Sequence, residues 1–166
     1  MHTVALTPAG WHLNSICRSG VRIMAAAALA VGLGTSSVHA DDHKAMAGTW
    51  RVISLDANGS LNDSEDVRKI TVINEPNGDW SLVVDGNTIA KGTSAIDEAT
   101  NPKTVDLTIT ESSDGNNVGR TYEGIYELGT DTRRVCLAMD GGERPTQFFS
   151  AAGSGHVLVT YEKVED

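Results

Sequence analysis

Apolar positions after residue 47 come in short runs that are separated by turn-forming residues. The runs are rich in Val, Ile and Thr and are bounded by Gly, Asn, Asp or Pro, which is typical of strands and turns. The clearest alternation is Lys103 to Thr110, where Val105, Leu107 and Ile109 face one way and the polar residues between them face the other. Since no stretch shows a sustained helical period, the pattern predicts an all-β domain.

Eight strands are expected from these runs and their punctuation. They are predicted near Thr49 to Asp56, Val67 to Asn74, Trp80 to Asp85, Thr88 to Ile96, Lys103 to Thr110, Arg120 to Leu128, Arg133 to Asp140 and His156 to Val164. Most connections are short enough for sequential strands to pair as hairpins, whereas a Greek-key sandwich needs longer crossing connections. Closure also removes the free edges of the sheet. The prediction is an eight-stranded up-and-down antiparallel barrel.

The first forty residues have the order of a secretory signal peptide. Arg18 and Arg22 precede an apolar run from Ile23 to Leu33, and small residues follow up to Val38-His39-Ala40. The run is shorter than the roughly twenty residues that span a bilayer as a helix. We therefore expect a signal peptide at 1–40 and one periplasmic or secreted domain at 41–166, with an uncleaved membrane anchor as the alternative.

Export changes the charge and the cysteine content of the chain. The net charge is −9 overall, but residues 1–40 contain two arginines and no acid, so the remaining 126 residues carry 11 basic and 22 acidic side chains, a net −11. This charge disfavours nucleic acid and anionic membrane surfaces as partners, and no membrane span is expected after cleavage. Only Cys136 remains, so an internal disulfide is excluded. We expect a buried structural thiol there, with a reactive thiol as the alternative.

Three sites in the sequence resemble lipocalin motifs. Gly48-Thr49-Trp50 resembles the G-x-W motif that opens lipocalins and related calycins, and Gly129-Thr130-Asp131-Thr132 resembles their T-D-aromatic turn, with Thr132 departing from the aromatic. Lys163 stands where lipocalins often place an arginine over the first-strand tryptophan. The resemblance implies that Trp50 is a barrel plug and that Lys163 lies over its ring.

A wider resemblance covers nearly all of residues 47 to 164. The chain is similar to a family of uncharacterised bacterial lipocalin-like (calycin-like) domains in the segments Gly48-Thr49-Trp50, Gly124 to Leu128, Arg134 to Ala138, Glu143 to Thr146 with Phe148, and Gly153 to His156. It implies the fold and carries no activity with it.

Catalytic and metal-binding patterns are weak in this sequence. His43 and His156 are not at metal-ligand spacing. Glu123 and Glu127 share one strand face, which permits paired-carboxylate chemistry but more often describes solvent-facing acids. We expect no enzyme activity, no metal and no cofactor.

The leading hypothesis is a protein that binds a small apolar or amphipathic molecule inside the barrel. Candidate cavity-lining residues come from the apolar strand faces: Leu82, Val84, Val105, Leu107, Ile109, Tyr122, Tyr126, Leu137 and Met139. The alternative is a protein-interaction module, such as an envelope-enzyme inhibitor, that uses rim loops. There Arg144 and Phe149 are the candidate residues, for a protein partner or a carboxylate-bearing ligand.

The signal-peptide pattern predicts that the mature protein begins at Asp41. Amino-terminal sequencing of the protein from a periplasmic or extracellular fraction checks this. Recovery of intact Met1, or of the protein only from cytosol, would contradict it.

Overall fold

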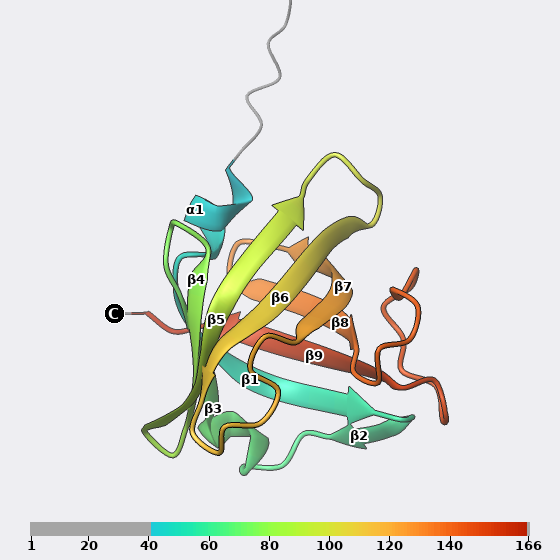
Figure 1. Cartoon of the computed structure of the whole chain (residues 1–166), viewed down its shortest axis with the longest axis horizontal. Helices are drawn as coiled ribbons and strands as arrows, with labels where there is room; N and C mark the ends of the chain where they lie inside the picture. Colours follow the sequence, from blue (N-terminus) through green and yellow to red (C-terminus); the bar gives the residue numbers. More distant parts are fainter. Residues whose placement is uncertain (1–40, 166) are drawn as a thin grey trace, which may run out of the picture. The chain divides into compact units, whose positions relative to one another are not determined.

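The computed structural model describes residues 41–165, so the expected signal peptide at 1–40 lies outside the described residues. The described part is nearly all strand, with one short α-helix, α1 (Asp42–Met46), and one 3-10 turn, η1 (Val67–Lys69). The strands are β1 (Gly48–Ala57), β2 (Ser60–Asn62), β3 (Ile70–Asn74), β4 (Asp79–Val84), β5 (Asn87–Asp97), β6 (Lys103–Ser112), β7 (Thr121–Leu128), β8 (Thr132–Ala138) and β9 (His156–Lys163) (Figure 1).

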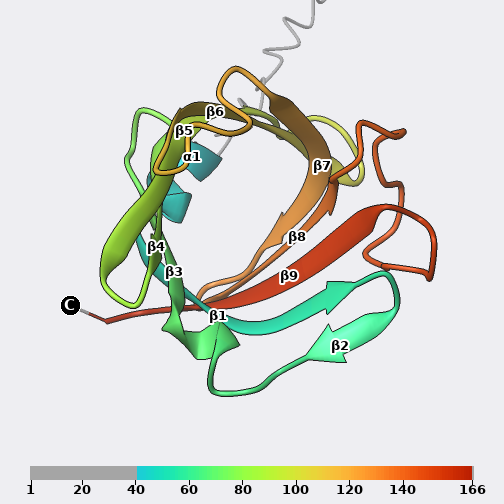
Figure 2. The ribbon, with the colours of Figure 1, turned by 60° about the horizontal axis from the view of Figure 1, so that its bottom comes forward.

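Eight of these strands form a closed antiparallel barrel in up-and-down order, as predicted. The order is β1-β3-β4-β5-β6-β7-β8-β9, and β9 returns to pair with β1 from Trp50↔Lys163 to Ala57↔Val157. The ring formed by these strands is seen in Figure 2. The fold is therefore an all-β, eight-stranded up-and-down antiparallel barrel.

Three local features differ from the predicted elements. Helix α1 is only five residues long, too short to show a helical period in the sequence. Val67–Lys69 forms a 3-10 turn instead of the start of a strand, so β3 begins at Ile70. The three exposed residues of β2 pair only with the end of β1, outside the barrel ring.

Helix α1 lies at the end of the barrel where the β3–β4, β5–β6 and β7–β8 turns gather; we call this the α1 end and the opposite one the far end. The backbone N–H of Asp42 donates to Glu98 in the β5–β6 turn, at 2.8 Å. The Asp42 carboxylate, almost completely buried, accepts hydrogen bonds from Lys103 Nζ at 2.6 Å and from the Tyr126 hydroxyl at 2.7 Å. These bonds tie α1 to two barrel strands.

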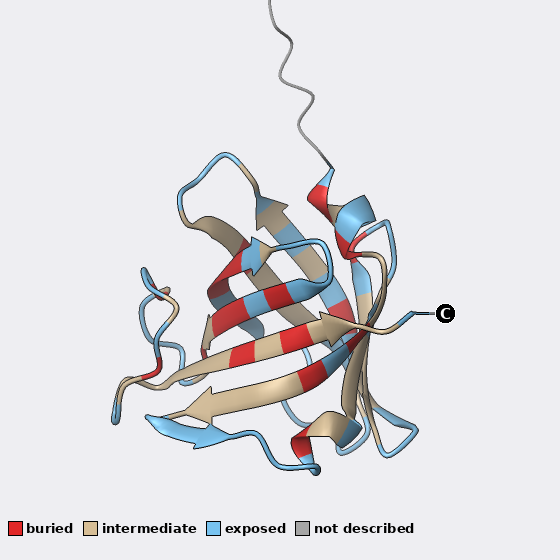
Figure 3. Ribbon diagram, turned by 180° about the vertical axis from the view of Figure 1, so that it is seen from behind, coloured by how far each residue is buried: buried red, intermediate tan, exposed pale blue. Residues whose placement is uncertain are grey.

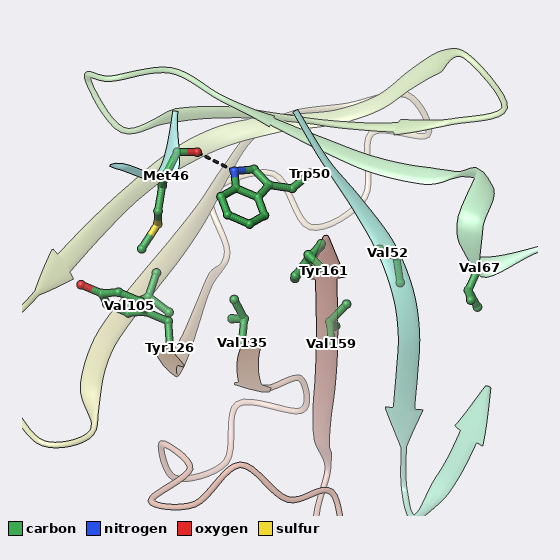
Figure 4. Close-up of a cluster of buried hydrophobic side chains, with 9 residues drawn as sticks. All are labelled: Met46, Trp50, Val52, Val67, Val105, Tyr126, Val135, Val159 and Tyr161. Atoms are coloured by element: carbon green, nitrogen blue, oxygen red, sulfur yellow. Dashed lines mark hydrogen bonds between the residues drawn. The ribbon is translucent and has the colours of Figure 1, made fainter. Parts of the chain in front are cut away.

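Trp50 is completely buried at the α1 end. Its Nε1 donates a 2.7 Å hydrogen bond to the carbonyl of Met46, so the helix and the first strand are joined through the indole (Figure 4). Two cations lie over the ring: Lys163 Nζ is 5.5 Å from the ring centroid and the Arg133 guanidinium carbon is 4.9 Å from it. The sequence resemblance implied the first of these contacts and not the second.

The burial of Trp50 predicts a large loss of stability in Trp50→Ala. Removing the indole leaves a cavity and leaves the Met46 carbonyl without its hydrogen-bond donor, so the free energy of unfolding should fall by about 3 to 5 kcal/mol. Denaturant melts of the variant and the parent measure this. Leu61→Ala, at an exposed position of β2, is the control and should change stability by less than about 0.5 kcal/mol. A loss below about 1 kcal/mol in Trp50→Ala would make the indole peripheral.

Candidate functional site

The barrel encloses a cavity of about 230 Å³ with a mostly apolar and aromatic wall. Every barrel strand except β1 supplies wall residues, and α1 supplies one: Met46, Val72, Asn74, Trp80, Leu82, Ala90, Ser94, Val105, Leu107, Ile109, Tyr122, Tyr126, Arg133, Val135, Leu137, Met139 and Tyr161. An engineered apolar cavity of roughly 150 Å³ is large enough to bind benzene. The interior is therefore open enough for a small organic molecule.

The structure places eight of the nine expected lining residues on this wall: Leu82, Val105, Leu107, Ile109, Tyr122, Tyr126, Leu137 and Met139. Their positions follow from the two-residue alternation of the strands. Val84 is not on the wall. It shares a strand face with Leu82 but is the last residue of β4, next to the β4–β5 turn, and so lies past the cavity toward the far end.

Two glycines leave room for the bulky wall residues. A Cβ at Gly92 would lie 2.4 Å from the Trp80 ring and 2.0 Å from the Thr108 carbonyl oxygen. A Cβ at Gly124 would lie 2.6 Å from the Leu137 side chain. The absence of side chains at these positions lets Trp80 and Leu137 lie against the neighbouring strand.

Arg133 is the wall residue that the sequence reasoning missed and that most changes the character of the cavity. The sequence contained the information, because Arg133 is two residues before Val135 and four before Leu137, and alternate residues of a strand share one face. Its neighbour Arg134 is exposed and forms an ion pair with Glu127. Two adjacent arginines therefore occupy opposite faces of the barrel wall.

The Arg133 guanidinium is buried between two aromatic rings. Only 5% of the residue is exposed, and its central carbon lies 4.9 Å from the Trp50 ring and 4.4 Å from the Tyr161 ring. Burial lowers the pKa of Arg133, and the neighbouring Tyr161 offsets part of this effect. An arginine starts from a pKa so high that it stays charged. Its Nε has no hydrogen-bond partner among the described residues.

Two neutral donors on the wall also lack partners in the described part of the chain. Asn74 Nδ2 and Trp80 Nε1 are buried without a hydrogen bond, and the two residues are directly opposite each other across β3 and β4. Two other polar groups on the wall form hydrogen bonds within the chain: the Ser94 hydroxyl donates to the Gly78 carbonyl, and the Tyr126 hydroxyl donates to the Asp42 carboxylate. Burial and this bond to Asp42 raise the pKa of Tyr126 well above its usual range, so the hydroxyl keeps its proton.

The candidate rim residue Arg144 lies on the outer wall of the barrel. Its Nη1 donates to the carbonyls of Gly124, at 2.8 Å, and Val105, at 3.2 Å, while Nη2 forms a 2.7 Å ion pair with Asp106. The guanidinium therefore fastens the loop 139–155 to β6 and β7. This is a structural role, and it leaves little of the guanidinium for a carboxylate ligand.

The two phenylalanines of the same loop differ in exposure. Phe149 is 62% exposed, whereas Phe148 is half-buried with the Arg134 guanidinium carbon 4.7 Å from its ring centroid. The loop runs beside β8 and β9; Figure 3 shows buried and exposed residues on β8, and buried and intermediate residues on β9. Phe149 is thus the exposed rim residue.

The other candidate catalytic and metal-binding side chains do not come together in one site. Glu127 pairs with Arg134, while Glu123 lies 3.8 Å from Arg144, so the two carboxylates do not form one site. Cys136 is completely buried, and burial raises the pKa of its thiol, as expected of a structural cysteine. Within residues 41–165, no cluster of three His, Cys, Asp or Glu side chains is arranged to hold a metal ion.

Comparisons with known proteins give one structural likeness. No family model and no curated protein matches the sequence. Among solved structures, a lipocalin-like protein from Bacteroides uniformis ATCC 8492 aligns with a TM-score of 0.46 and 13% sequence identity, over 72% of this chain and 99% of that one. In the described part of the chain, no helix has the length and apolarity needed to cross a membrane.

The contacts of Arg144 predict that Arg144→Ala releases the loop 139–155 from the barrel. Hydrogen exchange in this loop should rise several-fold, and the free energy of unfolding should fall by about 1 to 3 kcal/mol, because charged hydrogen bonds to two carbonyls are lost. Exchange mass spectrometry and denaturant melts measure both effects. Glu143→Ala, at the exposed neighbouring position, is the matched control. Unchanged exchange in Arg144→Ala would contradict the fastening role.

Proposed function

We propose that this domain is an exported binding protein that holds a small apolar or amphipathic molecule in the barrel cavity and performs no covalent chemistry on it. The observation that carries the proposal is the cavity itself. An eight-stranded barrel is just wide enough either to be filled by its own side chains or to hold one small ligand. Here the inward side chains leave about 230 Å³ between them.

The composition of the wall supports an apolar or amphipathic ligand. Aliphatic, aromatic and methionine side chains supply most of it, and a few polar groups are placed among them. Small-molecule sites in proteins have this character, although those for drug-sized molecules are usually roughly 300 to 1,000 Å³. The volume therefore favours a ligand at the small end of that range.

Export to the periplasm or the exterior is the second part of the proposal. Its support is the sequence pattern of residues 1–40, with two arginines, a short apolar run and a small-residue site ending at Ala40. The acidic surface of the remaining chain agrees with a protein that does not bind nucleic acid.

A protein-interaction module acting through the rim is the second candidate, and the exposed Phe149 is the observation in its favour. Its weakness is Arg144, whose guanidinium is bonded to the outer barrel wall. The cavity, in contrast, has no role in that function. We therefore prefer the small-molecule proposal.

Filling the cavity tests the proposal. The parent should take up a hydrophobic fluorescent probe saturably and one-to-one, and unrelated apolar ligands should compete for the site. Leu137→Trp adds volume inside the cavity and should reduce uptake at least about tenfold, which corresponds to about 1.4 kcal/mol of binding free energy. Leu61→Trp makes the same change on the exposed strand β2 and should bind like the parent.

Fluorescence titration and near-ultraviolet circular dichroism distinguish lost binding from lost folding. If fatty acids, isoprenoids and aromatic ligands all fail to saturate the folded parent, the small-molecule proposal is wrong. Partner capture that weakens in Phe149→Ala would then favour the interaction module.

A further inference from the structure

The cavity wall contains one cation and no carboxylate. Arg133 is the only Lys, Arg or His side chain among the wall residues, and none of them is Asp or Glu. None of the ion pairs formed within residues 41–165 includes Arg133. A buried charge without a counter-ion is unfavourable, because burial removes its hydration. The positive charge of Arg133 therefore lacks a counter-ion on the cavity wall.

The aromatic neighbours of Arg133 stabilise its charge only in part. Trp50 and Tyr161 lie against the guanidinium with ring centroids 4.9 and 4.4 Å from its central carbon. The Tyr161 side chain also hydrogen-bonds to the guanidinium, but neither ring face supplies an oxygen acceptor for the remaining N–H groups. The unpartnered Nε shows the consequence. A ligand oxygen would bind the part of the guanidinium that lines the cavity.

The other unpartnered nitrogens lie in the same half of the barrel. Asn74 is the last residue of β3 and Trp80 the second of β4, both at the α1 end, and Arg133 is the second residue of β8, which also begins there. All three groups are hydrogen-bond donors at the unpartnered atom. This half of the cavity wall therefore contains three donor nitrogens that have no partner among the described residues.

The far half of the cavity is apolar by comparison. Leu107, Ile109 and Met139 line it near the β6–β7 and β8–β9 connections, and the wall has no charged side chain there. The two halves of the cavity together fit a ligand that has hydrogen-bond acceptors at one end and an apolar body.

We infer that the ligand is an amphipathic monocarboxylate, bound with its carboxylate on Arg133 at the α1 end and its apolar body toward the far end. The inference rests on the proposed function and specifies its ligand class. A single guanidinium matches one negative charge, and its planar fork matches the two oxygens of a carboxylate. A phosphate dianion would leave one charge without a partner in the cavity.

Three straight-chain probes of equal length test the head group: decanoate, decanol and decylamine. Isothermal titration of the purified protein should give a dissociation constant for decanoate that is about ten- to hundredfold lower than for decanol, since charged hydrogen bonds are worth that much. Decylamine should bind most weakly, because its ammonium would lie beside the guanidinium.

Three variants locate the effect. Arg133→Met removes the cavity cation, so decanoate should lose its advantage while decanol binds within about threefold of its parent value. Lys163→Met is the matched control: it also removes a cation from the Trp50 ring, but Lys163 is not on the cavity wall, so the preference should remain. Arg133→Lys should recover part of the preference, because the charge returns without the planar fork.

The outcomes separate the two proposals. Equal affinity of the parent for decanoate and decanol overturns the monocarboxylate inference and leaves the binding function intact. A preference that survives in Arg133→Met, or that disappears equally in Lys163→Met, also overturns it. If none of the three probes binds the folded parent, the binding function fails and the inference fails with it. The comparison of probes on the parent decides the head group even if Arg133→Met does not fold.

Discussion

The pairing of β9 with β1 closes the sheet, and the interior of the protein exists because of this closure. An open sheet of eight strands would expose two edges and one apolar face to water. Closure turns the inward residues of every strand toward one another and limits the space between them. The core, the cavity and the burial of Arg133 all follow from this geometry, and so does the outer wall to which Arg144 attaches.

The α1 end of the barrel is closed by the chain's own helix. At the α1 end, Trp50 bonds to Met46, and Asp42 accepts from Lys103 and Tyr126, so the helix is bound to the strands by hydrogen bonds as well as by packing. The remaining volume runs from beneath this layer toward the far end. The unpartnered donors lie next to the packed layer, and the apolar wall lies farther from it. A head-in orientation of an amphipathic ligand follows from that asymmetry.

Three arginines show how position in the fold decides the role of one side-chain type. Arg134 is exposed and pairs with Glu127 across the hairpin, where water screens both charges and the pair contributes little to stability. Arg144 is bonded to carbonyls and to Asp106, so its donors are satisfied within the chain. Arg133 is buried between aromatic rings and has no carboxylate partner within the described residues. Only the last has donor capacity left for a ligand in the cavity.

The sequence by itself determined the strands, their up-and-down order and eight residues of the cavity wall. These depend on local rules, because side chains alternate along a strand and short turns join neighbours. The sequence also showed that Arg133 faces inward, because it alternates with Val135 and Leu137 on one strand. Helix α1 and the turn at Val67–Lys69 were too short to produce a periodic signal, and the exclusion of Val84 depends on where the cavity ends. Only the tertiary structure decided whether the barrel was open or filled, because that volume is a small difference between the space inside eight strands and the side chains that enter it. It also decided that Arg144 finds its partners on β6 and β7, and that no carboxylate on the cavity wall reaches Arg133, because such contacts join residues far apart in the chain.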